Sequence, residues 1–115
     1  MRYTKSLKGS VNFKRVLKQG KYVSGKILAV YVKKNSVEDE NNLGICVSKK
    51  HGNSVIRNKL KRWAREAYYF YEKEIVRGYN IVILYRKDMH VNELNFNVVR
   101  DEIKDLFIKN DLLYG

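Results

Sequence analysis

The stretch VSKKHGNSVIRNKLKRWAREAY, residues 47–68, combines a helical pattern of apolar residues with a dense run of positive charge. It holds seven Lys or Arg residues and no acid before Glu66. At about 100° per residue, five apolar side chains fall within a sector roughly 80° wide. They are Ile56, Leu60, Trp63, Ala67 and Phe70. The pattern predicts an amphipathic helix whose apolar stripe packs against the rest of the fold.

The other side of this helical wheel, at roughly 100° to 240°, is polar and cationic. It holds Arg57, Asn58, Lys61, Arg62 and Arg65. Like charges four residues apart each cost about 0.2–0.5 kcal/mol. A fully buried Leu or Ile side chain contributes about 1.5–3 kcal/mol. Burial of the apolar stripe is therefore expected to stabilise the helix and to leave its cationic side free for a polyanion.

The charge of the whole chain is one-sided. The 115 residues include 24 Lys or Arg against 12 Asp or Glu, a formal charge of +12. Residues 66–115 hold seven positive and nine negative side chains, so the excess belongs to residues 1–65. The segment at 48–53 adds Lys49, Lys50 and free amide groups near a helix N-terminus, where anions are stabilised. This distribution favours a nucleic acid partner over the two alternatives, an anionic membrane surface and a merely solvated face.

The chain length fits one domain, residues 1–115. Its longest apolar run, ILAVYV at 27–32, is far shorter than the roughly 20 residues of a membrane span. The first ten residues lack the apolar stretch of a secretory signal. The single Cys46 lies in an apolar run and is interpreted as a core filler. A cytoplasmic protein is expected.

Strands and two further helices are predicted around the quoted helix. Strands are predicted at 22–24, 26–34, 43–48 and 79–86. The last of these is apolar almost throughout, which indicates burial on both faces. Residues 11–19 are predicted to form a helix with Ser10 as N-cap, with Gly20 at its end and with Phe13, Val16 and Leu17 on one face. The polar loop at 35–42, with Glu38, Asp39 and Glu40, is expected to be solvated rather than to hold a metal.

The last segment is predicted to be an amphipathic helix that covers the sheet. Asn92 is its expected N-cap, and its apolar face holds Phe96, Val99, Ile103, Leu106 and Phe107. The strand at 43–48, the quoted helix and the strand at 79–86 form a βαβ unit. The sequence therefore predicts an α/β sandwich with one sheet of about four strands and three helices.

The block VSKK, followed by GNSVIRNKLKRWAREAY, closely resembles the signature of the protein subunit of bacterial ribonuclease P. That enzyme removes the 5′ leader from precursor tRNA. The Arg-Asn-Arg box of the family stands here as Arg57, Asn58 and Lys59. SVNFKRVLKQG is similar to the family's first helix, and Tyr31 lies near the position of its cleft aromatic. The resemblance covers roughly residues 5–110.

The resemblance implies a ribosomal protein S5 domain 2-like fold with a left-handed βαβ crossover, against a general preference that is about 98% right-handed. It also implies that catalysis belongs to the RNA subunit, which binds most of the Mg²⁺, and that the protein binds this RNA and the single-stranded leader. The implied RNA-subunit contacts are Lys49, Lys50, Asn53, Arg57, Asn58, Lys59, Lys61, Arg62 and Arg65. The implied leader contacts are Phe13, Lys14, Leu17, Tyr31 and Lys33.

Two residues depart from the family pattern. Leu17 stands where members often carry a second aromatic residue, and Lys59 replaces the second Arg of the box. Lys59 keeps the charge but loses bidentate geometry. Phe13 and Tyr31 have two interpretations, since such aromatics either stack on unpaired bases or fill a core.

No catalytic residue is predicted in the protein. The acids form no convincing metal-binding cluster, and His51 and His90 are expected at the surface without a paired acid or nucleophile. A general double-stranded RNA-binding or ribosomal protein and a self-sufficient metallonuclease are the alternative functions.

Overall fold

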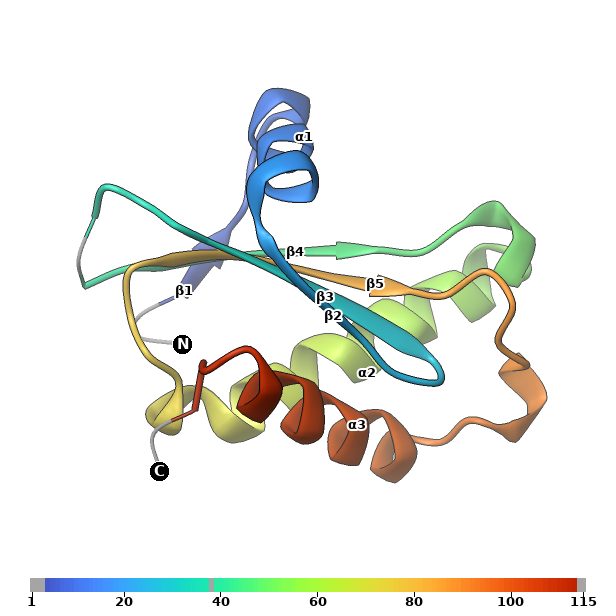
Figure 1. The fold of residues 1–115 in the computed structure, drawn as a ribbon. Coiled ribbons are helices and arrows are strands. Elements are labelled where there is room, and N and C mark those ends of the chain that lie inside the picture. Colours follow the sequence, from blue (N-terminus) through green and yellow to red (C-terminus); the bar gives the residue numbers. More distant parts are fainter. Residues whose placement is uncertain (1–3, 38, 114–115) are drawn as a thin grey trace.

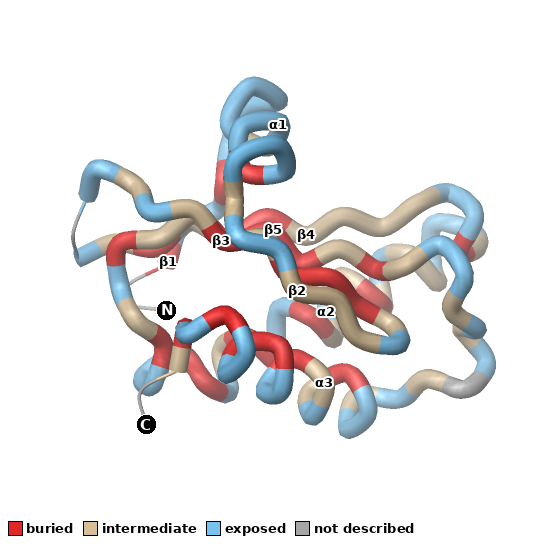
Figure 2. The backbone as a smooth tube through the Cα atoms, in the orientation of Figure 1, coloured by how far each residue is buried: buried red, intermediate tan, exposed pale blue. Residues whose placement is uncertain are grey.

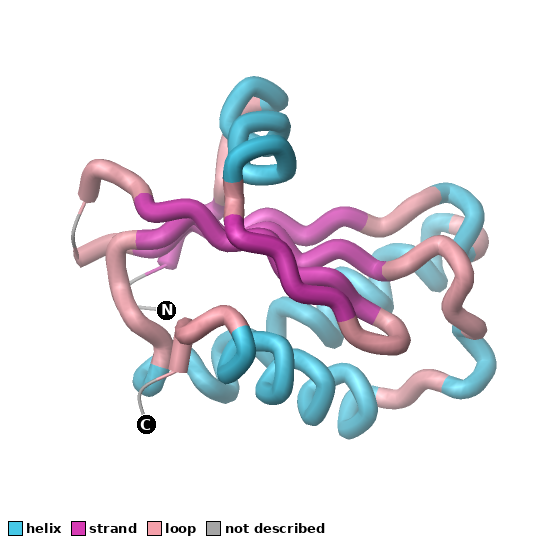
Figure 3. The backbone as a smooth tube through the Cα atoms, in the orientation of Figure 1, coloured by secondary structure: helices cyan, strands magenta, loops and turns pink. Residues whose placement is uncertain are grey.

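The computed structural model describes residues 4–37 and 39–113, which form one five-stranded sheet and three α-helices (Figure 1). The strands are β1 (Thr4–Ser6), β2 (Lys21–Ser24), β3 (Leu28–Lys34), β4 (Asn41–Cys46) and β5 (Tyr79–Tyr85). The helices are α1 (Ser10–Gln19), α2 (Ser54–Tyr71) and α3 (Phe96–Lys109). Short 3₁₀ turns are η1 (Lys49–His51), η2 (Glu72–Glu74) and η3 (Val91–Glu93) (Figure 3). The predicted α/β sandwich is confirmed.

The helices cover the two faces of the sheet unequally. The strand order is β1-β4-β5-β3-β2, with α2 and α3 on one face and α1 on the other (Figure 1). Strand β5 is central and is buried on both faces, as predicted (Figure 2). Ile81 and Ile83 join the large core under α2 and α3. Val82 points the other way and packs with Leu7 and Val16 under α1.

The βαβ unit is present, because β4 and β5 are parallel neighbours joined through α2. The fifth strand, β1, was not predicted. It has three residues without an apolar alternation, and it is held by parallel pairing to β4. Strand β4 begins at Asn41, inside the predicted solvated loop, and Asn41 is buried. Its side chain replaces missing backbone partners by accepting from Tyr79 N at 2.9 Å and donating to Val76 O at 3.1 Å.

Two predicted helix caps are wrong. Gly9 precedes α1 as the N-cap, and Ser10 is the first helical residue. The N-cap of α3 is Asn95, whose Oδ1 accepts from Val98 N at 2.9 Å. Asn92 instead belongs to η3, a separate turn that precedes α3. The predicted end of α1 is confirmed, since Gly20 N donates to Val16 O at 2.8 Å.

Helix α2 is rotated relative to the predicted stripe. Its buried residues are Leu60, Ala64, Ala67, Tyr68 and Tyr71. At 100° per residue, the centre of this set lies about 60° from the predicted centre. Phe70, predicted to be in the core, is 64% exposed.

Two tyrosines explain the rotation, because their hydroxyls find partners under the helix. Tyr68 Oη lies 2.7 Å from Thr4 Oγ1 and accepts from Asn41 Nδ2 at 3.3 Å. Burial raises the pKa of Tyr68 to about 12, so this hydroxyl stays neutral. Tyr71 Oη donates to Arg100 O of α3 at 3.4 Å. Small Ala64 and Ala67 side chains allow the close approach that these contacts require.

A carboxylate fixes α3 to the β2–β3 hairpin. Glu102 accepts from the backbone N–H groups of Lys26, Ile27 and Leu28, at 3.0, 2.8 and 2.6 Å. Gly25 leaves room for this group, because a Cβ there would lie 2.7 Å from Glu102 Cδ. The hairpin therefore depends on a side chain about 75 residues away in the sequence.

Glu102→Ala is expected to lower the free energy of unfolding by about 1.5–3 kcal/mol, the range for hydrogen bonds to a charged group. Urea unfolding followed by circular dichroism measures the change. Asp105→Ala removes an exposed acid from the same helix and is the matched control, with an expected change within about 0.5 kcal/mol. Equal effects of the two substitutions would contradict the role given to Glu102.

Candidate nucleic-acid interface

The turn before α2 is held by side-chain caps and presents lysines at the helix N-terminus. Asn53 caps α2, its Oδ1 accepting from Ile56 N at 3.0 Å. Ser48 Oγ accepts from Lys50 N at 3.2 Å at the start of η1. Lys49 and Lys50 are exposed on this turn. Their charges lie beside the unpaired amides of a helix N-terminus, an arrangement that stabilises anions.

His51 holds this turn against the sheet, and the expectation of a surface histidine is wrong. It is 6% exposed. Its Nδ1 accepts from Ser48 N at 3.1 Å, so Nε2 carries the proton and donates to Arg86 O at 2.8 Å. His90, by contrast, is exposed as expected. No local pattern predicts the burial of His51, because its partner Arg86 lies 35 positions away.

Most of the cationic side of α2 faces solvent. Asn58, Arg62 and Arg65 are exposed, and Lys59 and Lys61 are half-buried. Arg62 forms the one ion pair of an α2 cation among the described residues, a 3.8 Å contact with Glu66. Such exposed pairs contribute about 0.2–1 kcal/mol. The face therefore keeps nearly all its positive charge available to a polyanion.

Arg57 and Lys59 are the α2 cations whose side chains are held most closely by the protein. Arg57 is half-buried, and its Nε is buried without a hydrogen-bond partner among the described residues. Lys59 Nζ lies 5.1 Å from the centre of the Trp63 ring, within cation–π range. These two side chains are thus more constrained than Arg62 and Arg65.

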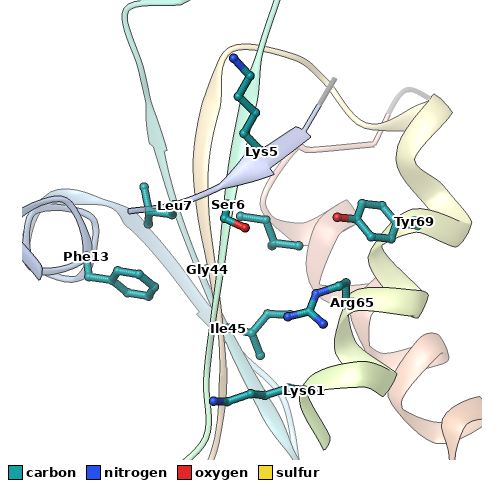
Figure 4. A pocket seen from close by; sticks show the side chains of 10 residues that line it. Lys5, Ser6, Leu7, Phe13, Gly44, Ile45, Lys61, Arg65 and Tyr69 are labelled. Carbon is teal, nitrogen blue, oxygen red and sulfur yellow. The ribbon is translucent and has the colours of Figure 1, made fainter. Parts of the chain in front are cut away.

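A hollow of about 190 Å³ joins α2 to the short edge strand β1 (Figure 4). Lys61 and Arg65 of α2 and Phe13 of α1 all line it. Lys5 and Tyr69 complete its rim and were not predicted. Tyr69 had a detectable signal, since it follows Arg65 by four residues on the same helix, but Lys5 had none because β1 was not predicted. The hollow therefore brings Phe13, an implied leader contact, together with Lys61 and Arg65, two implied RNA-subunit contacts.

Phe13 reaches this hollow because Gly44 has no side chain. A Cβ at Gly44 would lie 2.4 Å from Phe13 Cζ, closer than real Cβ contacts. The half-buried Phe13 ring thus lies directly on the backbone of β4. Tyr31 and Cys46 pack with Phe13 around the small cluster under α1.

Two of the predicted leader contacts, Phe13 and Lys33, line different hollows. Phe13 and Tyr31 pack on the same cluster, and the Tyr22 ring lies 4.8 Å from that of Tyr31. Leu17 is 37% exposed, and Lys14 is exposed beside it on α1. Lys33 instead lines a second hollow, described below. Phe13, Tyr22 and Tyr31 thus gather on the α1 face, with Leu17 on the same side of α1 as Phe13, and we name these four side chains the aromatic groove.

Burial also sets the chemistry of Cys46 and Tyr31. Burial raises the pKa of the Cys46 thiol, and the nearby Lys61 ammonium opposes this shift. Burial, followed by the neighbouring Tyr22, raises the pKa of Tyr31. Both groups are protonated at neutral pH. Half-buried Cys46 thus fits the expected role of a small apolar filler.

Residues 4–37 and 39–113 contain no group of three or more His, Cys, Asp or Glu side chains placed to hold a metal ion. Of the three acids in the loop at 35–42, Asp39 is exposed, and Glu40 pairs with Lys5 at 2.6 Å. Glu38 lies outside the described residues. None of the described helices is long and apolar enough to cross a membrane.

The sheet, its three helices and the cationic face beside an aromatic groove define an α/β protein with a site suited to an extended polyanion. The Ribonuclease P family model matches residues 1–111. The Ribonuclease P protein component of Clostridium acetobutylicum is 36% identical over 108 residues, which cover 93% of this chain and 89% of that protein.

Two solved structures have the same fold. The Staphylococcus aureus RNase P protein has a TM-score of 0.84 and 28% identity, with 97% of this chain and 98% of that chain covered. The Thermotoga maritima RNase P protein has a TM-score of 0.82 and 30% identity, with 96% and 99% covered. The chain therefore belongs to the bacterial ribonuclease P protein family. Its place is in the ribonuclease P holoenzyme, which processes tRNA 5′ ends, and an RNA subunit is its implied partner.

Gly44→Ala is expected to displace the Phe13 ring and to lower the free energy of unfolding by about 1–3 kcal/mol, as overpacking does. Phe13→Ala removes the ring that the new methyl group would meet. The double variant should therefore be more stable than the sum of the single changes predicts, by more than about 0.5 kcal/mol. Urea unfolding of all four proteins measures this coupling, and additive effects would contradict the contact.

Proposed function

We propose that the protein binds the catalytic RNA subunit through α2 and its preceding turn, and binds the single-stranded 5′ leader of precursor tRNA in the groove on the α1 face. In this way it promotes endonucleolytic removal of the leader. The observation that carries the proposal is the hollow where Phe13 lies beside Lys61 and Arg65. Stacking and phosphate-binding groups thus meet at one point between the two surfaces.

The RNA-subunit contacts follow the exposed cations. Arg62 and Arg65 offer guanidinium groups to phosphates, and Lys49 and Lys50 extend the surface to the helix N-terminus. The remaining contacts that we assign to this surface are Asn53, Arg57, Asn58, Lys59 and Lys61. Phosphate contacts position an RNA without reading its sequence.

The leader-binding role rests on aromatic rings and unpaired charge. Phe13 and Tyr31 each provide a ring face for an unpaired base, worth about 1–3 kcal/mol per stacked base. Lys14 lies beside this groove, and Leu17 supplies an apolar wall instead of a second ring. Because mature tRNA has no leader, such contacts raise the affinity for precursor over product.

We assign the hydrolysis to Mg²⁺ held mainly by the RNA subunit, with no catalytic residue in the protein. The protein residues would then bind and position the RNA subunit and the substrate. Mg²⁺ held by the RNA would supply the activated nucleophile. A complex that matures tRNA would act in the cytoplasm, and we propose that location.

The leader-binding role is tested with the reconstituted holoenzyme at low Mg²⁺. We expect tighter binding of precursor tRNA than of mature tRNA, and we expect Phe13→Ala combined with Tyr31→Ala to remove most of this difference. Filter binding on both tRNAs measures it. Equal affinities of the unaltered holoenzyme would favour the alternative of a general double-stranded RNA-binding protein.

A cleavage assay with the protein alone, without the RNA subunit, tests the alternative of a self-sufficient nuclease. A mutant of the Staphylococcus aureus protein has defective mRNA degradation activity, so mRNA is included as a substrate beside precursor tRNA. Cleavage of precursor tRNA by the protein alone would overturn the assignment of catalysis to the RNA. If the protein cleaved mRNA but not precursor tRNA, it would have a second activity, and the assignment of tRNA cleavage to the RNA subunit would be unchanged.

Arg65→Ala is expected to weaken binding of the RNA subunit and to lower the slope of log affinity against log salt by about one, the effect of one lost phosphate contact. Lys104→Ala removes an exposed charge from α3 and is the matched control, with an unchanged slope. An unchanged slope for Arg65→Ala would remove this residue from the interface.

A further inference from the structure

A second hollow, of about 380 Å³, lies on the α1 face of the sheet. It is lined by side chains of α1, the end of β3, the loop that follows, and the adjoining parts of β4 and β5. Of the residues that line the Phe13 hollow, it shares only Leu7. On the α1 wheel, its residues Asn12 and Arg15 lie roughly 60° apart and on the other side from Lys14 and Leu17. It is therefore separate from the aromatic groove.

The second hollow concentrates positive charge. Arg15, Lys33 and Lys34 line it, and none of its lining residues is a carboxylate. Glu40, in the nearby loop, is paired with Lys5 at 2.6 Å. Three cations without a lining acid favour an anionic ligand, and Arg15 offers the planar fork that suits phosphate oxygens.

Amide side chains in the hollow are oriented as donors. Asn80 Oδ1 accepts from Asn42 Nδ2 at 2.9 Å and from Asn35 Nδ2 at 3.3 Å. Asn35 is fixed in turn, because its Oδ1 accepts from Val37 N at 2.8 Å. With its oxygen occupied twice, Asn80 has its NH₂ group left to donate, and no described residue accepts from it. The network therefore presents N–H donors beside the three cations.

We propose that the second hollow binds a phosphate group of a single-stranded RNA, with Arg15, Lys33 and Lys34 neutralising its charge and Asn80 donating a hydrogen bond. The inference rests on the proposed function in taking RNA as the source of the phosphate. None of the lining residues is aromatic, so the hollow offers no ring on which a base could stack. Its volume exceeds the roughly 300 Å³ at which small-ligand sites begin.

The test uses the protein alone, without RNA subunit or tRNA, so that its outcome is independent of the reconstitution assays. A five-residue uridine oligonucleotide is titrated into ¹⁵N-labelled protein, and the side-chain amide signal of Asn80 is followed by NMR. We expect this signal to shift with the oligonucleotide and to stay unchanged with the nucleoside uridine, which lacks phosphate. An equal shift with uridine, or no shift with the oligonucleotide, would overturn the proposal.

The variant Arg15→Ala combined with Lys34→Ala removes two exposed charges of the hollow. We expect it to reduce the Asn80 shift and to lower the salt slope of oligonucleotide binding by about 0.7, the value for one lost phosphate contact on a single strand. Lys109→Ala, on α3, is the matched control with no expected change. Unchanged signals of buried Tyr85 show that the fold is intact. If the Asn80 amide signal of the double variant shifted as far as that of the unaltered protein, the proposed phosphate site would be contradicted.

Discussion

Burial of one side of α2 against the sheet is the interaction on which the rest of the structure depends. Leu60, Ala64 and Ala67 are fully buried, and Tyr68 links the helix to β1 and β4 through Thr4 and Asn41. Apolar burial outweighs the repulsion between cations on the outer side by several kcal/mol. The helix can therefore carry a strongly cationic face at little cost to its stability.

The same docking decides where the cations point. A rotation of about 60° from the position that apolar periodicity predicts moves Arg57 and Lys61 toward the sheet and turns Phe70 outward. Lys61 and Arg65 thereby reach the hollow at the edge of β4, where Phe13 arrives from the opposite face over Gly44. The site therefore depends on the rotation of α2 and on the glycine at position 44, which leaves room for the Phe13 ring.

Polar side chains fix the segments that apolar burial leaves undetermined. His51 holds the turn before α2 to the end of β5, and Glu102 holds the β2–β3 hairpin to α3. Asn41 and Asn80 do the same for the start of β4 and β5. Each of these groups satisfies backbone or amide partners at a strand end, which is where regular pairing runs out.

The sequence by itself determined the fold class, the βαβ unit, the amphipathic helices and the family, because periodicity, charge and the motif around Arg57 are local patterns. Only the tertiary structure decided the pairing of β1, the burial of His51, the rotation of α2 and the meeting of Phe13 with Lys61 and Arg65. These features depend on partners tens of residues away. A hydroxyl such as that of Tyr68 favours burial only when an acceptor or donor is already in place, and no local pattern encodes that.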